Sequence, residues 1–230
     1  MLRSFRFLLQ FAWMNLGVLL AFAAVVAAGC YATGVPEGAD NLFATYYGAF
    51  PLVILFVLFI YAFALCTSNL NLGLSFGARR RDFFWAVQGV LLVYTGVCWL
   101  LVLAMAYLPA VDNWVVQGRL TLIRAFAGDT LWVFPLVCLS IQILGCLGGL
   151  VSSRSKAWGA VVISVAVILL LAGSVLLAFM ADGDLWFFLT GGAWSGLWGS
   201  LPVILVLVVL AALAGGEAVL WRWISRFVVR

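Results

Sequence analysis

Few side chains in this sequence are suited to acid–base or nucleophilic chemistry, and the commonest catalytic types are missing. The chain has no histidine, which is the usual general base and metal ligand. Its one lysine, Lys156, follows Ser155 and has no glycine-rich loop ahead of it, as a phosphate-binding loop requires. No two carboxylates lie within one apolar segment. We therefore predict that the chain is not itself an enzyme and binds no cofactor or metal of its own.

The cysteines also carry no recognisable site. They are scattered through apolar segments, without any Cys-x-x-Cys spacing, at Cys30, Cys66, Cys98, Cys138 and Cys146. Buried cysteine usually behaves as a small apolar residue. We expect neither a disulfide framework nor a metal site.

A small set of polar or amphipathic side chains lies inside apolar segments. Five of them are candidate cavity-lining residues: Asn15, Asn69, Gln88, Trp99 and Gln142. Polar groups are costly in lipid, so they either bond to neighbouring helices or line a wet cavity that opens to the cytoplasm. Glu217 lies about one turn before Arg222, where it either snorkels to the interface or takes part in proton coupling.

The elements that carry these residues are membrane spans. Of the 230 residues, 67% are hydrophobic and 9% charged, whereas a soluble domain is about half apolar and about a quarter charged. We predict an all-α integral membrane protein, a single transmembrane domain over residues 1–230. A span needs about 20 apolar residues. Six segments qualify: about 11–33, 47–69, 84–108, 130–151, 157–181 and 201–221.

The basic residues predict the orientation. With both termini in the cytoplasm, ten of the twelve basic residues are cytoplasmic: Arg3, Arg6, Arg79, Arg80, Arg81, Arg154, Lys156, Arg222, Arg226 and Arg230. Only Arg119 and Arg124 are outside. The positive-inside rule favours this arrangement over its inverse.

Three segments do not fit simple spans. Residues 2–13 have Arg3, Arg6 and Gln10 on one side and predict an interfacial elbow helix, or else the inner end of the first span. Residues 110–129 predict an amphipathic helix on the outer surface. Residues 185–199 are apolar but short and contain Gly191 and Gly192, which indicates outer re-entrant helices or an aromatic loop on the membrane.

Glycines in two spans are suited to close helix packing. They lie in 130–151 (Gly145, Gly148, Gly149) and in 201–221 (Gly215, Gly216).

The most charged stretch is the turn at 72–84. Apolar residues flank three arginines there, and Gly73 and Gly77 let the chain change direction. Its arginines are either only a topology signal or a docking surface for an acidic groove on a soluble partner, since guanidinium groups bind carboxylates bidentately. The candidate coupling residues are Ser75, Phe76, Gly77, Arg79, Arg80, Arg81, Asp82 and Phe83.

Two stretches resemble a known family. Ser75-Phe-Gly-Ala-Arg-Arg-Arg-Asp-Phe-Phe84 is similar to the Ser-Leu-Gly-Val-Thr-Arg-Arg-Asp-Phe-Phe pattern of bacterial ABC transporter permeases of the short, six-span exporter type, with Arg79 replacing a small polar residue. The basic tail Trp221-Arg-Trp-Ile-Ser-Arg-Phe-Val-Val-Arg230 is similar to tails of that group. The resemblance implies a permease in the bacterial cytoplasmic membrane that pairs with a second permease subunit and two ABC ATPase subunits. ATP and Mg²⁺ would be bound by the ATPases, and the 72–84 turn would transmit their motion.

This leads to a transporter hypothesis with two alternatives. The first is an ATP-driven exporter of a hydrophobic or amphipathic peptide, lipid or drug, working by alternating access. The alternatives are the six-span substrate-binding subunit of a vitamin-type importer, or a small membrane immunity or assembly protein without an ATPase. None of these functions involves nucleic acid.

Overall fold

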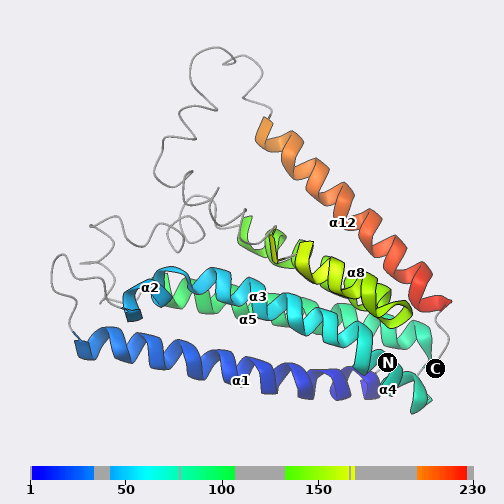
Figure 1. Cartoon of the computed structure of the whole chain (residues 1–230), viewed down its shortest axis with the longest axis horizontal. Helices are drawn as coiled ribbons and strands as arrows, with labels where there is room; N and C mark the ends of the chain where they lie inside the picture. The colour runs from blue at the N-terminus through cyan, green and yellow to red at the C-terminus, as the bar shows by residue number, and fades with distance from the viewer. Residues whose placement is uncertain are drawn as a thin grey trace.

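The computed structural model describes residues 2–33, 42–77, 79–106, 133–165, 167–168 and 201–226, and every element among them is helical (Figure 1). The elements are α1 (Leu2–Thr33), α2 (Leu42–Gly48), α3 (Phe50–Ala64), η1 (Leu65–Asn69), α4 (Leu70–Ser75), α5 (Arg80–Ala106), α8 (Val133–Arg154) and α12 (Leu201–Ser225). A further helical segment, Lys156–Val165, follows α8.

Among the described residues, four helical segments are long and apolar enough to cross a membrane. They are Arg3–Cys30, Phe50–Ser75, Arg80–Ala106 and Phe134–Arg154, and they match the first four predicted spans. The chain is therefore a multi-helix, membrane-embedded protein. α12 has 25 residues and covers the predicted sixth span. Most of the predicted fifth span, and the predicted outer segments at 110–129 and 185–199, lie outside the described residues.

α1 is one continuous helix of 32 residues, so the predicted elbow helix over 2–13 is not a separate element. The physical reason is a buried stripe that crosses the expected boundary without a break. Its members lie three or four residues apart: Leu8, Ala12, Leu16, Leu19, Ala23, Val26 and Cys30. That spacing keeps one face of a straight helix against the bundle. The alternative interpretation, the inner end of the first span, agrees with the structure.

The second span consists of three helical pieces. α3 leads into the π-helix η1, and α4 continues to Ser75. At the junction the Thr67 hydroxyl donates to the carbonyl of Phe63 (3.0 Å), and the Ser68 hydroxyl donates to that of Ala64 (3.1 Å). Side-chain bonds to carbonyls one turn earlier compete with the regular helical ladder, which suits a local change of helical pitch.

Fewer residues separate the second span from the third than the sequence analysis predicted. The second was expected to end at Asn69 and the third to begin at Phe84, but α4 ends at Ser75 and α5 begins at Arg80. The predicted turn at 72–84 is therefore confined to residues 76–79. Leu72, Leu74, Phe83 and Phe84 are helical residues of α4 and α5.

The closest helix packing lies between α3 and α8. A Cβ placed on Gly145 would lie 2.7 Å from the carbonyl oxygen of Phe59, and one on Gly149 would lie 2.5 Å from that of Phe63. Only glycine permits this approach of one helix to the backbone of another. The prediction of close packing is confirmed at these two residues.

The other predicted packing glycines differ from one another. A Cβ on Gly148 or Gly216 would meet a side chain, that of Val162 or Ile143 respectively. A Cβ on Gly215 would have nothing within 4 Å, so the prediction was wrong there.

α5 lies at the centre of the bundle and contacts α1, α3, α8 and α12. Its Tyr94 ring stacks on Tyr61 of α3 with 4.8 Å between ring centroids. The Tyr47 hydroxyl of α2 donates to the carbonyl of Met105, near the far end of α5. α5 is thus held to α3 near its middle and to α2 near its end.

The start of α1, the end of α12 and α4 lie at the same end of the bundle (Figure 1). The ends of α8 and α12 that carry Arg154 and Arg222 lie there too. The described basic residues at this end are all exposed: Arg3, Arg6, Arg79, Arg80, Arg81, Arg154, Lys156, Arg222 and Arg226. The bundle thus has one strongly basic end, which we call the basic end.

We predict that Gly149→Ala destabilises the bundle while Gly215→Ala does not. The first adds a methyl group against the Phe63 carbonyl, and overpacking costs about 1–3 kcal/mol. The second adds it in open space, where alanine favours a helix by up to about 1 kcal/mol. Thermal unfolding in detergent measures both, and equal melting temperatures for the two variants would contradict the packing described here.

Candidate functional site

The candidate site is the turn between α4 and α5 at the basic end. Gly77 has a φ of 80°, a left-handed conformation that glycine adopts without strain. The amide of Phe76 donates to the carbonyl of Leu72 (3.2 Å) and that of Gly77 to Leu74 (3.0 Å), which closes α4. The amide of Phe83 donates to the Arg79 carbonyl (2.9 Å) and opens α5. The turn is therefore short and fixed by backbone bonds on both sides.

Its exposed side chains form what we call the turn patch: Phe76, Arg79, Arg80 and Arg81. Phe76 is 76% exposed, although its ring makes a T-shaped contact with the ring of Phe7 on α1, with 6.5 Å between the ring centroids. The three arginines are all exposed. An exposed aromatic ring beside three guanidinium groups is a composition enriched in protein interfaces. Arginine also binds carboxylates bidentately, so the patch suits an acidic partner surface.

Phe83 and Phe84, next to the patch, are buried anchors. Phe83 is 0% exposed and fills the space over Gly73, where a Cβ would lie 2.6 Å from its ring. Phe84 packs edge-on against Trp221 of α12 at 5.0 Å. Phe83 therefore packs the start of α5 against α4, and Phe84 packs it against α12.

Arg80 adds a polar link to the same helix. Its guanidinium Nη1 donates to the carbonyl of Ser225, the last residue of α12, at 3.0 Å. A cation at a helix C-terminus satisfies a carbonyl that has no partner within the helix and interacts favourably with the helix dipole. Arg80 thus joins the turn to α12, while Arg79 and Arg81 are exposed. Asp82 is half-buried in the first turn of α5.

Ser75, one of the predicted coupling residues, is the last residue of α4. Gly73-Leu-Ser-Phe-Gly77 has the Gly-x-Ser-x-Gly spacing of a nucleophile elbow. Such an elbow is a strand-to-helix turn, whereas Ser75 ends a helix and donates to the Leu72 carbonyl at 2.7 Å. The surroundings of this serine are those of a helix terminus.

In the described part of the chain, the predicted cavity-lining residues lie in different surroundings. Gln142 of α8 is fully buried, donates to the carbonyl of Leu91 (3.3 Å) and accepts from the Thr95 hydroxyl (3.1 Å). It therefore links α8 to α5, as the helix-to-helix interpretation predicted. Trp99 is half-buried in α5, and Asn69 is half-buried at the end of η1.

Gln88 and Glu217 form a second polar link, between α5 and α12. The Gln88 side-chain amide donates to a carboxylate oxygen of Glu217. Glu217 is half-buried, and this bond holds its carboxylate against α5. Sequence reasoning named both residues but did not pair them, because 129 positions separate them.

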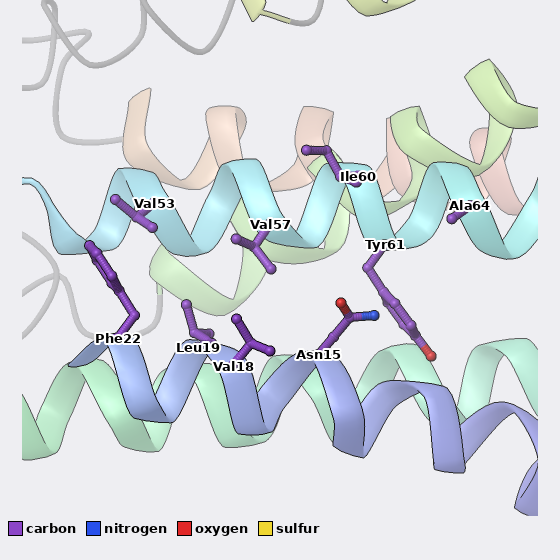
Figure 2. A pocket seen from close by; sticks show the side chains of 9 residues that line it. All are labelled: Asn15, Val18, Leu19, Phe22, Val53, Val57, Ile60, Tyr61 and Ala64. Atoms are coloured by element: carbon purple, nitrogen blue, oxygen red, sulfur yellow. The ribbon is translucent and has the colours of Figure 1, made fainter. Parts of the chain in front are cut away.

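Asn15 lies elsewhere, on the wall of a groove between α1 and α3 (Figure 2). Its side-chain amide donates to the carbonyl of Phe11 at 3.3 Å, within its own helix. The remaining lining is almost entirely aliphatic or aromatic. This groove was not predicted, because it depends on how two helices diverge.

Within the described part of the chain, no three His, Cys, Asp or Glu side chains gather in a way that could hold a metal ion. The sequence matches no model of a known protein family, no curated protein and no solved structure. The fold and the site therefore define a membrane-embedded helical bundle with a basic, partly aromatic surface at one end.

We predict that Thr95 and Gln142 are energetically coupled. Thr95→Val removes a donor, and Gln142→Leu removes both of that side chain's bonds. Within membranes such a bond contributes about 0.5–2 kcal/mol, so the double variant should lose less stability than the two single losses combined. The free energies of unfolding in detergent of the wild type, the two single variants and the double variant measure this coupling. Strictly additive losses would contradict a direct bond, and Gln10→Leu, at an exposed residue of α1, is the control for adding a leucine.

Proposed function

We propose that the chain is the membrane-spanning permease subunit of an ATP-driven ABC transporter, with ATP hydrolysis on separate partner subunits. The observation that carries the proposal is the turn patch. Three exposed arginines and an exposed phenylalanine stand at the basic end, directly beside residues that are locked into the bundle. A surface that only sets topology needs positive charge but no buried anchors.

The contacts of the turn suit the transmission of force. Phe83 connects the turn to α4, and Phe84 and Arg80 connect it to α12. Because packed helices move as rigid elements, displacement of the turn by a partner tilts these helices instead of bending one loop. This is the behaviour that alternating access requires of a coupling element.

The proposed setting follows from the same features. The basic end faces the cytoplasm of a bacterial cell, six spans cross its cytoplasmic membrane, and a second permease subunit completes the pathway. Two ABC ATPase subunits dock at the turn patches. An apolar bundle suits a hydrophobic or amphipathic substrate, such as a peptide, lipid or drug, and export is the direction of transport that we propose.

We predict that Arg79→Ala/Arg81→Ala weakens ATPase docking. Both guanidinium groups are exposed, so their loss should leave the fold intact. Charge-assisted bonds contribute about 1.5–3 kcal/mol each, so affinity should fall at least about tenfold. The measurement is purification from native membranes in mild detergent, with mass spectrometry and an ATP hydrolysis assay of whatever Walker-type subunit accompanies the chain.

The matched control is Arg3→Ala/Arg6→Ala, which removes the same charge from exposed positions at the same end. Arg80→Ala separates docking from transmission, because it cuts the bond to Ser225. It should retain the ATPase but uncouple hydrolysis from transport. Absence of any nucleotide-hydrolysing subunit in the wild-type preparation would reject the proposal. The second permease subunit is either another copy of this chain or a different permease, so an assembly with only one permease subunit in total would favour a substrate-binding subunit of an importer.

A further inference from the structure

A groove with a volume of about 440 Å³ runs between α1 and α3. Figure 2 shows its lining side chains projecting from both helices: Asn15, Val18, Leu19, Phe22, Val53, Val57, Ile60, Tyr61 and Ala64. Its volume and lining fit a site for an apolar ligand with few polar groups. Val18 is 69% exposed and Ile60 is 49% exposed, so the groove opens to the outside of the bundle.

The groove lies in the part of the α1–α3 pair that is away from the turn. Tyr61, at one end, stacks on Tyr94 near the middle of α5, and Val53, at the other end, lies close to the start of α3, away from the turn. With a rise of 1.5 Å per residue, the lining covers about 10 Å of α1 and about 16 Å of α3. One leaflet of a hydrocarbon core about 30 Å thick spans about 15 Å, and its chains run in the same direction as the helices.

The two polar side chains of the groove are already bonded to α1. The Asn15 amide donates to Phe11, and the Tyr61 hydroxyl donates to the carbonyl of Leu8 at 3.3 Å. A stable water needs two to four polar partners, so these walls do not suit water. An empty groove would forfeit dispersion contacts along both helices. Both walls belong to helical segments long and apolar enough to cross a membrane, where the surrounding medium is hydrocarbon.

We propose that this groove binds one acyl chain of a membrane phospholipid, in the leaflet opposite the basic end. The chain fills the space where α1 and α3 diverge, and its headgroup stays at the interface beyond Phe22 and Val53. α3 packs more extensively on α8 than on α1, so the lipid chain supplies part of the contact that α1 lacks. This proposal does not depend on the ATPase partner.

The test uses the full chain in nanodiscs that contain phosphatidylcholine with a diazirine in one acyl chain. After illumination, peptide mass spectrometry locates the cross-links. They should be enriched at least fivefold on residues 15–22 and 53–64 relative to the exposed face of Lys156–Val165. An even distribution over these lipid-facing segments would overturn the proposal.

Val57→Trp fills the groove and should lower its cross-linking at least fivefold. Val161→Trp makes the same change at an exposed valine outside the groove and should leave the yield unchanged. If Val57→Trp does not fold, Ile60→Phe narrows the mouth and should give the same loss. Undiminished labelling in the folded filling variant would overturn the proposal, as would labelling by a free diazirine fatty acid but not by the phospholipid.

Discussion

The direct contact of α8 with the backbone of α3 is the constraint on which the remaining packing depends. In lipid, apolar side chains gain little by leaving one hydrocarbon environment for another, so helices associate through close packing and hydrogen bonds. Gly145 and Gly149 bring α8 onto the carbonyls of Phe59 and Phe63. Gln142, on the same helix, then reaches α5, and Ile143 meets Gly216 of α12. Gly145 and Gly149 therefore set how close α3 lies to α8, the helix on which α5 and α12 also pack.

Two polar side chains, Gln142 and Gln88, join α5 to neighbouring helices. An unpartnered polar group at this depth is costly, and a bond to the neighbouring helix removes the cost without admitting water. Gln142 bonds to Thr95 and Leu91, and Gln88 bonds to Glu217. These links brace α5 against α8 and α12. α1 and α3 are joined by the bond from the Tyr61 hydroxyl to the Leu8 carbonyl, and beyond it, away from the turn, the helices leave a groove suited to a lipid chain.

The turn between α4 and α5 combines two opposite requirements. Its arginines and Phe76 must be exposed to meet a partner, whereas Phe83 and Phe84 must be buried for motion of the turn to reach the helices. The short backbone-closed turn permits both, because α5 begins within the charged stretch and places successive residues on different faces. The arginine cluster could be recognised in the sequence. The bond from Arg80 to Ser225 could not, since the two residues are 145 positions apart.

The sequence by itself determined that the chain is embedded in a membrane, where the first four spans lie and which segments carry positive charge, because apolar length and charge are local properties. The sequence analysis overestimated the length of the turn and separated the start of α1 from its span. Helix boundaries depend on the packing of neighbouring helices as well as on local composition. Only the tertiary structure decided that Gln88 bonds to Glu217, that Gly149 but not Gly215 is a close contact, and that Asn15 lines a groove between α1 and α3. Those outcomes depend on how distant helices are rotated and spaced, which hydropathy does not encode.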